Sequence, residues 1–238
     1  MKSIDKNPFP FFRGKIFLYQ PQDHKVSVDL ILFLSKIRGI KRKSLVVDLG
    51  AGFGFLSIVL AKKYGVKVIA VEIDEKMIEL LEENIHLNKL NDLIEVVRGD
   101  VKKIQNLFPK QFCDVIVTNP PFYPLNYTSK LNPYHFEVWG TLKDFLRASA
   151  YLLRDGGYLN ILIPSFRLYE AFNLLDKNNL PARFLSFIYP TIEKKAKLSI
   201  ITSIKNVKGP LECDKPLIIN KKNGEYTEEV KNLLESFL

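Results

Sequence analysis

The chain has 238 residues, 47% of them hydrophobic, and a formal net charge of +9, which fits one α/β domain of ordinary size with a sizeable core. Its two cysteines, Cys113 and Cys213, argue against a disulfide framework, and with only three scattered histidines we expect no metal site. No apolar run approaches the roughly 18 residues of a membrane span, and the first residues hold no signal-peptide core, so we expect a cytoplasmic protein without a membrane partner.

Positive charge is concentrated at the N-terminal end. In residues 1–43, ten lysines and arginines stand against three aspartates, and Lys41, Arg42 and Lys43 are consecutive. Concentrated positive charge is typical of a surface that binds a polyanion, although a solvated lysine-rich face gives the same pattern. We therefore predict that this segment binds nucleic acid and that Lys41, Arg42 and Lys43 contact the substrate.

The first predicted elements are a short strand at 15–19 and a mostly apolar helix from Ser27 to about Gly39. Asp29 is the exception in this apolar helix. It is either a first-turn acid placed favourably on the helix dipole or a polar group at the mouth of a ligand pocket.

A glycine-rich turn follows the first core strand, predicted at 45–49, and precedes a helix at 55–63. The turn carries three glycines, Gly50, Gly52 and Gly54. Glycines let the backbone approach a ligand closely, but a dinucleotide fingerprint would place its third glycine at 55, which is Phe. Asp48 near the strand end also suits a cationic amino-acid group better than a pyrophosphate. These features disfavour a nicotinamide cofactor.

Two further acids lie at or just after the ends of predicted strands. Glu72 ends the strand at 68–72, 24 residues after Asp48, where a carboxylate can accept both hydroxyls of a ribose. An amphipathic helix is predicted at 74–88 and a third strand at 94–98. Asp100 follows that strand, where a carboxylate can accept from an adenine amino group. Capping a helix at 101–107 is the plain interpretation and is compatible with that role.

The most specific stretch is Asn119-Pro120-Pro121-Phe122, at the end of a β-branched strand at 113–118. Two prolines remove two backbone donors and fix two φ angles. The Asn119 side chain and the neighbouring carbonyls are therefore held as acceptors beside an aromatic ring, which suits a flat substrate carrying an NH2 group. An ordinary strand-ending turn is the plain alternative.

An aromatic stretch without clear periodicity follows, from Tyr123 to Gly140. Its aromatic residues are Tyr123, Tyr127, Tyr134, Phe136 and Trp139. Loops of this length in a compact domain are usually functional, and we interpret this one as a substrate-side lid.

The remaining elements complete the architecture. We predict, in order, a helix at 142–153, a strand at 158–163, a helix at 168–175, strands at 183–189 and 198–204, a short strand at 216–219 and a helix at 227–238. Because no helix separates 183–189 from 198–204, they form an antiparallel hairpin whose tip lysines, Lys194, Lys195 and Lys197, touch phosphate or only solvent. The fold class is α/β, a doubly wound, mostly parallel seven-stranded sheet with an antiparallel last hairpin.

A single domain over residues 1–238 accommodates this order. It comprises a basic N-terminal extension (1–43), a binding and catalytic core (44–205) and a C-terminal extension (206–238).

The Asn-Pro-Pro-Phe turn, with a glycine-rich strand-turn-helix upstream, resembles the amino methyltransferases, which move a methyl group from S-adenosylmethionine (SAM) to a planar nitrogen. More narrowly, the chain resembles the bacterial adenine-N6 methyltransferases of position 37 in a valine tRNA. The segments that carry this resemblance, from Gln20 to the C-terminus, are Gln20…Ser27-Val28-Asp29, DLGAGFG, VEID, GD, NPPF and NGEYTEEV. The chain departs from the family at His24-Lys25, where the family usually has a glycine and an aromatic residue. The arginine-histidine-glutamate that often follows the Asn-Pro-Pro loop appears here only as His135 and Glu137, in a shifted register.

The resemblance implies roles for the residues above. SAM would be held by Asp29, Asp48, Gly50, Gly52, Gly54, Glu72, Asp100 and Asn119. Catalysis would rest on Asn119, Pro120 and Phe122, and the substrate would contact Pro121, Phe122, Tyr123 and the basic run Lys41, Arg42 and Lys43. The substrate would be an adenine in tRNA, and we favour a monomer.

Three other functions remain open at this point. A protein-glutamine methyltransferase uses the same turn, because an amide is also planar and carries an NH2 group. A guanine-N2 methyltransferase of ribosomal RNA is the second alternative, and a non-catalytic RNA-binding module on the same fold is the third.

Overall fold

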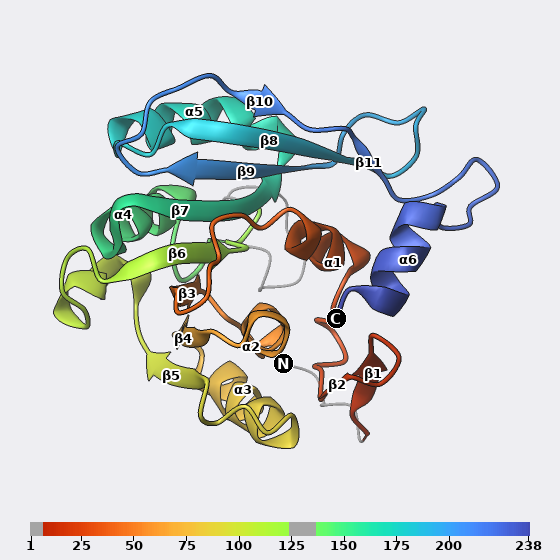
Figure 1. Ribbon diagram of the computed structural model, residues 1–238, viewed down its shortest axis with the longest axis horizontal. Coiled ribbons are helices and arrows are strands. Elements are labelled where there is room, and N and C mark those ends of the chain that lie inside the picture. The colour runs from red at the N-terminus through yellow and green to blue at the C-terminus, as the bar shows by residue number, and fades with distance from the viewer. Residues whose placement is uncertain (1–6, 124–136) are drawn as a thin grey trace.

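A computed structural model describes residues 7–123 and 137–238, which form a central sheet with helices on both faces (Figure 1). Most of the predicted lid, including Tyr127, Tyr134, His135 and Phe136, lies outside the described residues.

The central sheet contains the seven predicted strands. They are β3 (Leu45–Leu49), β4 (Lys67–Glu72), β5 (Ile94–Arg98), β6 (Cys113–Thr118), β7 (Leu153–Pro164), β8 (Ala182–Tyr189) and β9 (Leu198–Ile204). Their order is β8-β9-β7-β6-β3-β4-β5, with β9 antiparallel to both neighbours and the other pairs parallel. Two two-residue strands, β10 (Glu212–Cys213) and β11 (Leu217–Ile218), pair with β8 and extend the sheet to nine strands.

The hairpin of β8 and β9 is confirmed, but its second strand inserts between β8 and β7. Every residue of β9 is buried. A strand with both faces covered gains most from a hydrogen-bonding partner on each side, because water cannot reach its backbone groups.

Helices cover both faces of the sheet. They are α1 (Val28–Ser35), α2 (Phe55–Tyr64), α3 (Glu75–Leu87), α4 (Leu142–Leu152), α5 (Leu168–Lys177) and α6 (Glu228–Ser236), with 3-10 helices η1 (Val101–Asn106) and η3 (Ser165–Arg167). Among the described residues, no helix is long and apolar enough to cross a membrane. Most boundaries follow the prediction, but α1 ends at Ser35 rather than near Gly39. β7 begins at Leu153 rather than Tyr158, because Leu153 pairs with Cys113 before a register shift in β6.

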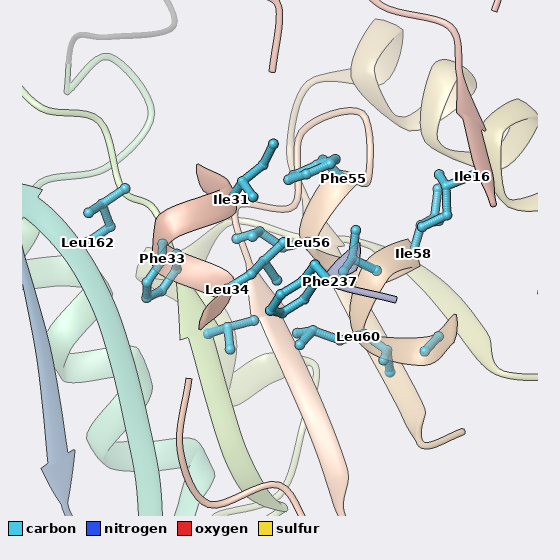
Figure 2. Packing of buried hydrophobic residues seen from close by; sticks show 14 of the residues in the cluster. Ile16, Ile31, Phe33, Leu34, Phe55, Leu56, Ile58, Leu60, Leu162 and Phe237 are labelled. Carbon is cyan, nitrogen blue, oxygen red and sulfur yellow. The ribbon is translucent and has the colours of Figure 1, made fainter. Parts of the chain in front are cut away.

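Successive side chains of β3 point to opposite faces of the sheet, and each face has its own hydrophobic core. Val46 belongs to the core under α1, α2 and α3, whereas Val47 belongs to the core under α4 and α5. Figure 2 shows the first core, in which α1, α2 and Phe237 meet. The side chains drawn there include Ile31, Phe33 and Leu34 from α1 and Phe55, Leu56, Ile58 and Leu60 from α2.

The N-terminal segment is a small hairpin of β1 (Phe9–Phe11) and β2 (Ile16–Leu18). β2 was predicted and β1 was not. Asn84 of α3, fully buried, joins this segment to the glycine-rich turn: its Oδ1 accepts from Tyr19 N at 2.8 Å, and its Nδ2 donates to Tyr19 O at 3.1 Å and Phe53 O at 2.9 Å. One amide therefore holds three parts of the chain together beside the carboxyl ends of the strands.

We predict that Asn84→Ala lowers the free energy of unfolding by about 1–3 kcal/mol, because it leaves buried backbone groups without partners. Urea unfolding measures this loss. The matched control is Asn173→Ala on the exposed side of α5, where the change should stay within about 0.5 kcal/mol. Equal midpoints for the two variants would contradict the bridging role of Asn84.

Candidate active site

A cavity of about 450 Å³ lies at the carboxyl ends of β3, β4 and β6. It is lined by the glycine-rich turn, Glu72 and the Asn119–Tyr123 segment, together with Asp29 and Lys197. β3 and β6 are adjacent strands whose following helices, α2 and α4, belong to opposite faces of the sheet. Such a switch point is where doubly wound sheets bind ligands.

Glu72 fixes the glycine-rich turn. Its Oε2 accepts from Gly52 N at 2.7 Å, and its Oε1 accepts from Ile73 N at 2.8 Å and Asp74 N at 2.9 Å. Burial raises the pKa of Glu72, and these three backbone hydrogen bonds act in the opposite direction. The predicted ligand-binding carboxylate therefore also shapes the cavity wall.

The glycines of the turn differ in role. Gly50 and Gly52 line the cavity, and a Cβ on Gly52 would meet none of the described atoms within 4 Å, so its open side can receive a ligand. Gly54 is not a lining residue. It caps α2 with φ of +93°, and a Cβ there would come within 2.3 Å of Leu81 Cδ1, so this glycine permits close packing.

Asp48 is fully buried behind the turn and does not line the cavity. Ser57 Oγ donates to its Oδ2 at 2.7 Å, while Oδ1 has no hydrogen-bond partner in the described part of the chain. Burial first, and the nearby charge of Glu72 second, raise the pKa of Asp48 to about 7, against the Ser57 hydrogen bond.

Asp29 lies at the cavity, as one of its two sequence interpretations required. Its Oδ2 accepts from Lys197 Nζ at 3.1 Å, and its buried Oδ1 lacks a partner among residues 7–123 and 137–238. It also stands in the first turn of α1, so its position fits either interpretation.

The Asn119–Tyr123 segment lies on the other side of the cavity, where all five of its residues are lining residues. Asn119 Oδ1 is buried, and no described residue donates to it. A buried carbonyl oxygen without a donor costs free energy unless a ligand satisfies it. Asn119 therefore combines a place in the cavity wall with a buried oxygen that no described residue satisfies.

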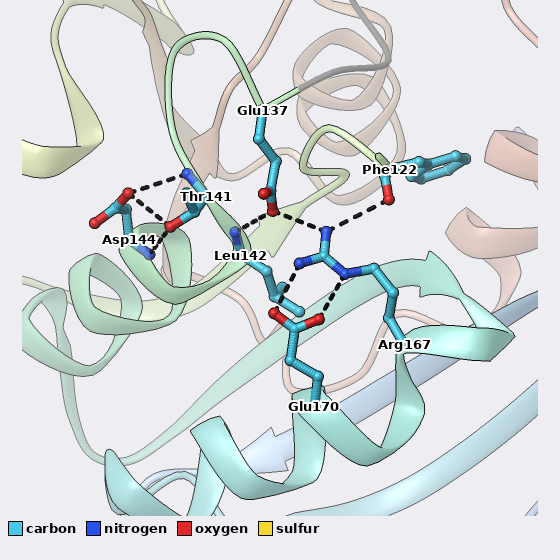
Figure 3. Close-up of polar contacts among 7 residues, drawn as sticks. All are labelled: Phe122, Glu137, Thr141, Leu142, Asp144, Arg167 and Glu170. Atoms are coloured by element: carbon cyan, nitrogen blue, oxygen red, sulfur yellow. Dashed lines mark hydrogen bonds and ion pairs between the residues drawn. The ribbon is translucent and has the colours of Figure 1, made fainter. Parts of the chain in front are cut away.

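An arginine braces this segment from behind (Figure 3). Arg167, only 5% exposed, donates from one guanidinium nitrogen to Phe122 O at 3.4 Å and to Glu137 Oε1 at 2.8 Å. Its other side pairs with Glu170 through two bonds of 2.8 Å. Glu137 Oε1 also accepts from Leu142 N at 2.8 Å, so the brace extends to the start of α4.

Some predicted site residues are not brought to the cavity. Asp100 caps η1 by accepting from Lys102 N at 2.9 Å, which is its structural interpretation, and it is not a lining residue. Lys41, Arg42 and Lys43 are exposed just before β3, at the amino end of that strand, whereas the cavity lies at its carboxyl end.

Sequence reasoning missed Arg167 and gave Lys197 only a place in a hairpin tip. A lone arginine after a strand has no local pattern to mark it. The available signal was Glu137, noted as a displaced acid, because an acid that becomes buried needs a cation near it.

Comparison with known proteins agrees with this geometry. The family model for the methyltransferase small domain matches residues 28–180, which is more than half of the chain. The chain belongs to this family. The matched residues run from α1 to the end of α5 and so contain the glycine-rich turn, Glu72 and the Asn-Pro-Pro-Phe segment.

The methyltransferase is also similar to individual proteins. A tRNA1(Val) (adenine(37)-N6)-methyltransferase of Actinobacillus pleuropneumoniae is 29% identical over 221 residues, covering 90% of this chain and 89% of the relative. A candidate protein N5-glutamine methyltransferase of Methanocaldococcus jannaschii is 30% identical over 155 residues, covering 60% of this chain and 72% of that relative.

Two solved structures show the same fold. One, described as a predicted O-methyltransferase of Agrobacterium tumefaciens, has a TM-score of 0.69 at 20% identity and covers 85% of this chain and 94% of its own. A geranyl diphosphate methyltransferase in complex with SAM has a TM-score of 0.57 at 12% identity, with 75% and 85% covered.

We predict that Arg167→Met lowers the free energy of unfolding by about 3–5 kcal/mol, because it leaves the buried Glu137 carboxylate, 8% exposed, without its cation. Urea unfolding measures this loss. Glu170→Gln is the matched control: Glu170 is 48% exposed, so its loss should cost about 1 kcal/mol or less. The double variant Arg167→Met/Glu137→Met should regain part of the stability. A single Arg167→Met variant as stable as the wild type would contradict the brace.

We also predict a pH effect at Asp48. Because its folded pKa of about 7 lies above its ordinary value of 3.8, the folded state holds a proton that the unfolded state has lost between these two values. The stabilisation that Asp48 contributes is therefore complete below pH 3.8 and is lost as the pH rises to 7, by an amount on the order of 4 kcal/mol. Asp48→Asn should lack this slope. Parallel stability profiles for the two proteins would show that Asp48 is ionised throughout.

Proposed function

We propose that this protein is a SAM-dependent methyltransferase that modifies the exocyclic N6 amine of an adenine in tRNA, at position 37. The observation that carries the proposal is Asn119 Oδ1, a buried acceptor without a described partner, held at the cavity by a turn with two prolines and the Arg167 brace. The resemblance to the tRNA1(Val) enzyme over 90% of the chain supports the substrate.

The cavity fits SAM by the chemistry of its walls. SAM is a cation with a ribose and an adenine, and when bound it supplies an electrophilic methyl group. Asp29 offers a buried oxygen without a described partner, and Glu72 retains lone pairs beside the open face of Gly52. We propose that Asp29 and Glu72 accept from the ammonium and ribose groups, with Gly50 and Gly52 against the cofactor. Asp48 lies behind the turn with a pKa of about 7, so it would add negative charge there only in its ionised form.

Gly54 and Asp100 support this site indirectly. We assign Gly54 to the packing of the turn on Leu81 and Asp100 to the cap of η1. Each keeps a lining residue in place: Gly54 follows Phe53, and Asp100 lies between Gly99 and Val101.

The proposed catalytic roles rest on positioning. An aromatic amine is a poor nucleophile because its lone pair is delocalised into the ring. Asn119 Oδ1 and the Pro120 carbonyl oxygen would accept hydrogen bonds from the two N–H groups. This would direct the nitrogen lone pair at the methyl group. Phe122 would stack on the base, aided by Pro121 and Tyr123. The stacking contributes about 1–3 kcal/mol to binding of the base. Most of the rate then comes from orientation and preorganised electrostatics.

The phosphates near the reacting base need cations at the same edge of the sheet. The hairpin tip between β8 and β9 lies at that edge, because Ser165 N at the end of β7 donates to Lys197 O at 3.0 Å. We therefore assign these contacts to Lys194, Lys195 and Lys197 rather than to the predicted run Lys41, Arg42 and Lys43 at the opposite end of β3.

The second candidate is transfer to a glutamine side chain, which would use Asn119 in the same way. The glutamine-type relative matches only 60% of the chain, whereas the tRNA-type relative extends over 90%. This difference favours the adenine.

Methylation of unmodified tRNA by the purified protein with SAM tests the proposal, with the digested nucleosides analysed by mass spectrometry. We expect N6-methyladenosine, and bulk tRNA from a deletion strain should lack that nucleoside at position 37. Methylated glutamine in a protein substrate, with unmodified tRNA left unchanged, would replace this function by the alternative.

We predict that Asn119→Ala lowers kcat by about 10²–10³, by analogy with removal of one transition-state hydrogen bond. SAM affinity and the melting temperature should change little. Single-turnover methylation and a thermal melt measure both effects. Phe122→Ala, the comparison variant, should weaken capture of the base instead. An Asn119→Ala protein that melts many degrees lower yet methylates at the wild-type rate would make Asn119 a structural cap.

A further inference from the structure

A row of aromatic rings leads from the cavity to the protein surface. Phe122 and Tyr123 line the cavity, with ring centroids 6.4 Å apart and planes at 74°. The ring of Phe166 in η3 lies nearly parallel to that of Tyr123, at 6.1 Å and 23°. Phe166 is 57% exposed, so part of its ring is open to solvent.

The residues around Phe166 are firmly held. Ser165 N donates to Lys197 O at 3.0 Å, and Ser165 Oγ lies 2.9 Å from Ser199 Oγ. On its other side, Arg167 is the buried centre of the brace (Figure 3). The exposed ring is therefore presented by a fixed 3-10 turn, and an aromatic ring in that setting stacks at little cost in conformational entropy.

Lysines lie on the hairpin tip that contacts η3 through its backbone. The bond from Ser165 to Lys197 places the β8–β9 hairpin tip beside η3, and Lys194 and Lys195 of that tip are exposed. Aromatic rings interleaved with lysines are the chemistry that binds single-stranded nucleic acid, where bases stack on rings and phosphates pair with cations.

We propose that Phe166, with Tyr123 behind it, is a stacking shelf for the unpaired nucleotide next to the reacting adenine, and that Lys194 and Lys195 hold the phosphates of that nucleotide. The inference rests on the proposed function and adds how the RNA outside the cavity is held. Because every base has a π face, the shelf accepts any neighbouring base, and the choice of the reacting base is left to Asn119 and Phe122.

The test compares Phe166→Ala with Phe9→Ala. Phe9 on β1 is of the same type and 55% exposed, and it is not a lining residue of the cavity. Binding of labelled unmodified tRNA should weaken by about 5- to 150-fold in Phe166→Ala, stay unchanged in Phe9→Ala and recover in Phe166→Trp. SAM affinity and melting temperature should stay at the wild-type values in all three variants, since both positions are exposed.

A fluorescent base reports the stack directly. With 2-aminopurine at the nucleotide beside the methylated adenine, wild-type protein should quench the fluorescence on binding, and Phe166→Ala should not. Wild-type tRNA affinity and quenching in Phe166→Ala, in a protein that methylates tRNA, would overturn the shelf alone. A wild-type protein that neither binds nor methylates tRNA would overturn the proposed function and the shelf with it.

The lysines are tested through salt. Lys194→Ala/Lys195→Ala should reduce the slope of log affinity against log salt by about 1.4–1.8, for two phosphate contacts. The matched control, Lys41→Ala/Lys43→Ala at the opposite end of β3, should leave the slope unchanged. The reverse pattern would place the RNA backbone at the amino end of the sheet and contradict the shelf.

Discussion

The site depends first on how the Glu72 carboxylate is satisfied. A carboxylate taken out of water must be compensated by donors, and here the donors are backbone N–H groups from the two segments that follow β3 and β4. These hydrogen bonds offset the cost of burying one charge, and they also fix the glycine-rich turn against the start of α3. Asn84 completes the arrangement from the helix side, because its amide also holds Phe53 O in that turn. The glycine-rich turn is therefore held in the cavity wall by hydrogen bonds to Glu72 and Asn84.

The two walls of the cavity are built by different means. On the β4 side, backbone donors surround an acidic side chain. On the β6 side, two prolines remove donors from the turn, and Arg167 restrains it through the Phe122 carbonyl. Asn119 and Asp29, each with a buried oxygen that lacks a described donor, both line this cavity. Such walls suit the proposed ligand, which is rich in N–H groups and carries positive charge.

The sequence predicted those parts of the fold whose signals are local. β-branched runs that stop at Glu72 or just before Asn119 indicated strands. Asp74 and Thr227 indicated helix starts, and in the structure they are the N-caps of α3 and α6. Contacts between distant parts of the chain left no such signal. β1 pairs with β2 only through a turn in which Phe12 and Arg13 have positive φ, which their residue types do not suggest. Likewise, the sequence shows the positive charge of residues 1–43. Only the sheet topology shows that Lys41 lies at the end of β3 opposite to the cavity.

The backbone bond from Glu137 N to Tyr123 O, at 3.0 Å, has a consequence for the stability of the fold. It joins the two residues that flank positions 124–136, and the Arg167 brace joins the same two parts of the chain through Phe122 O and Glu137 Oε1. The entropy of closing a loop grows only slowly with its length. A change in the number of residues between Tyr123 and Glu137 should therefore cost the fold little free energy, because these contacts keep the two ends joined.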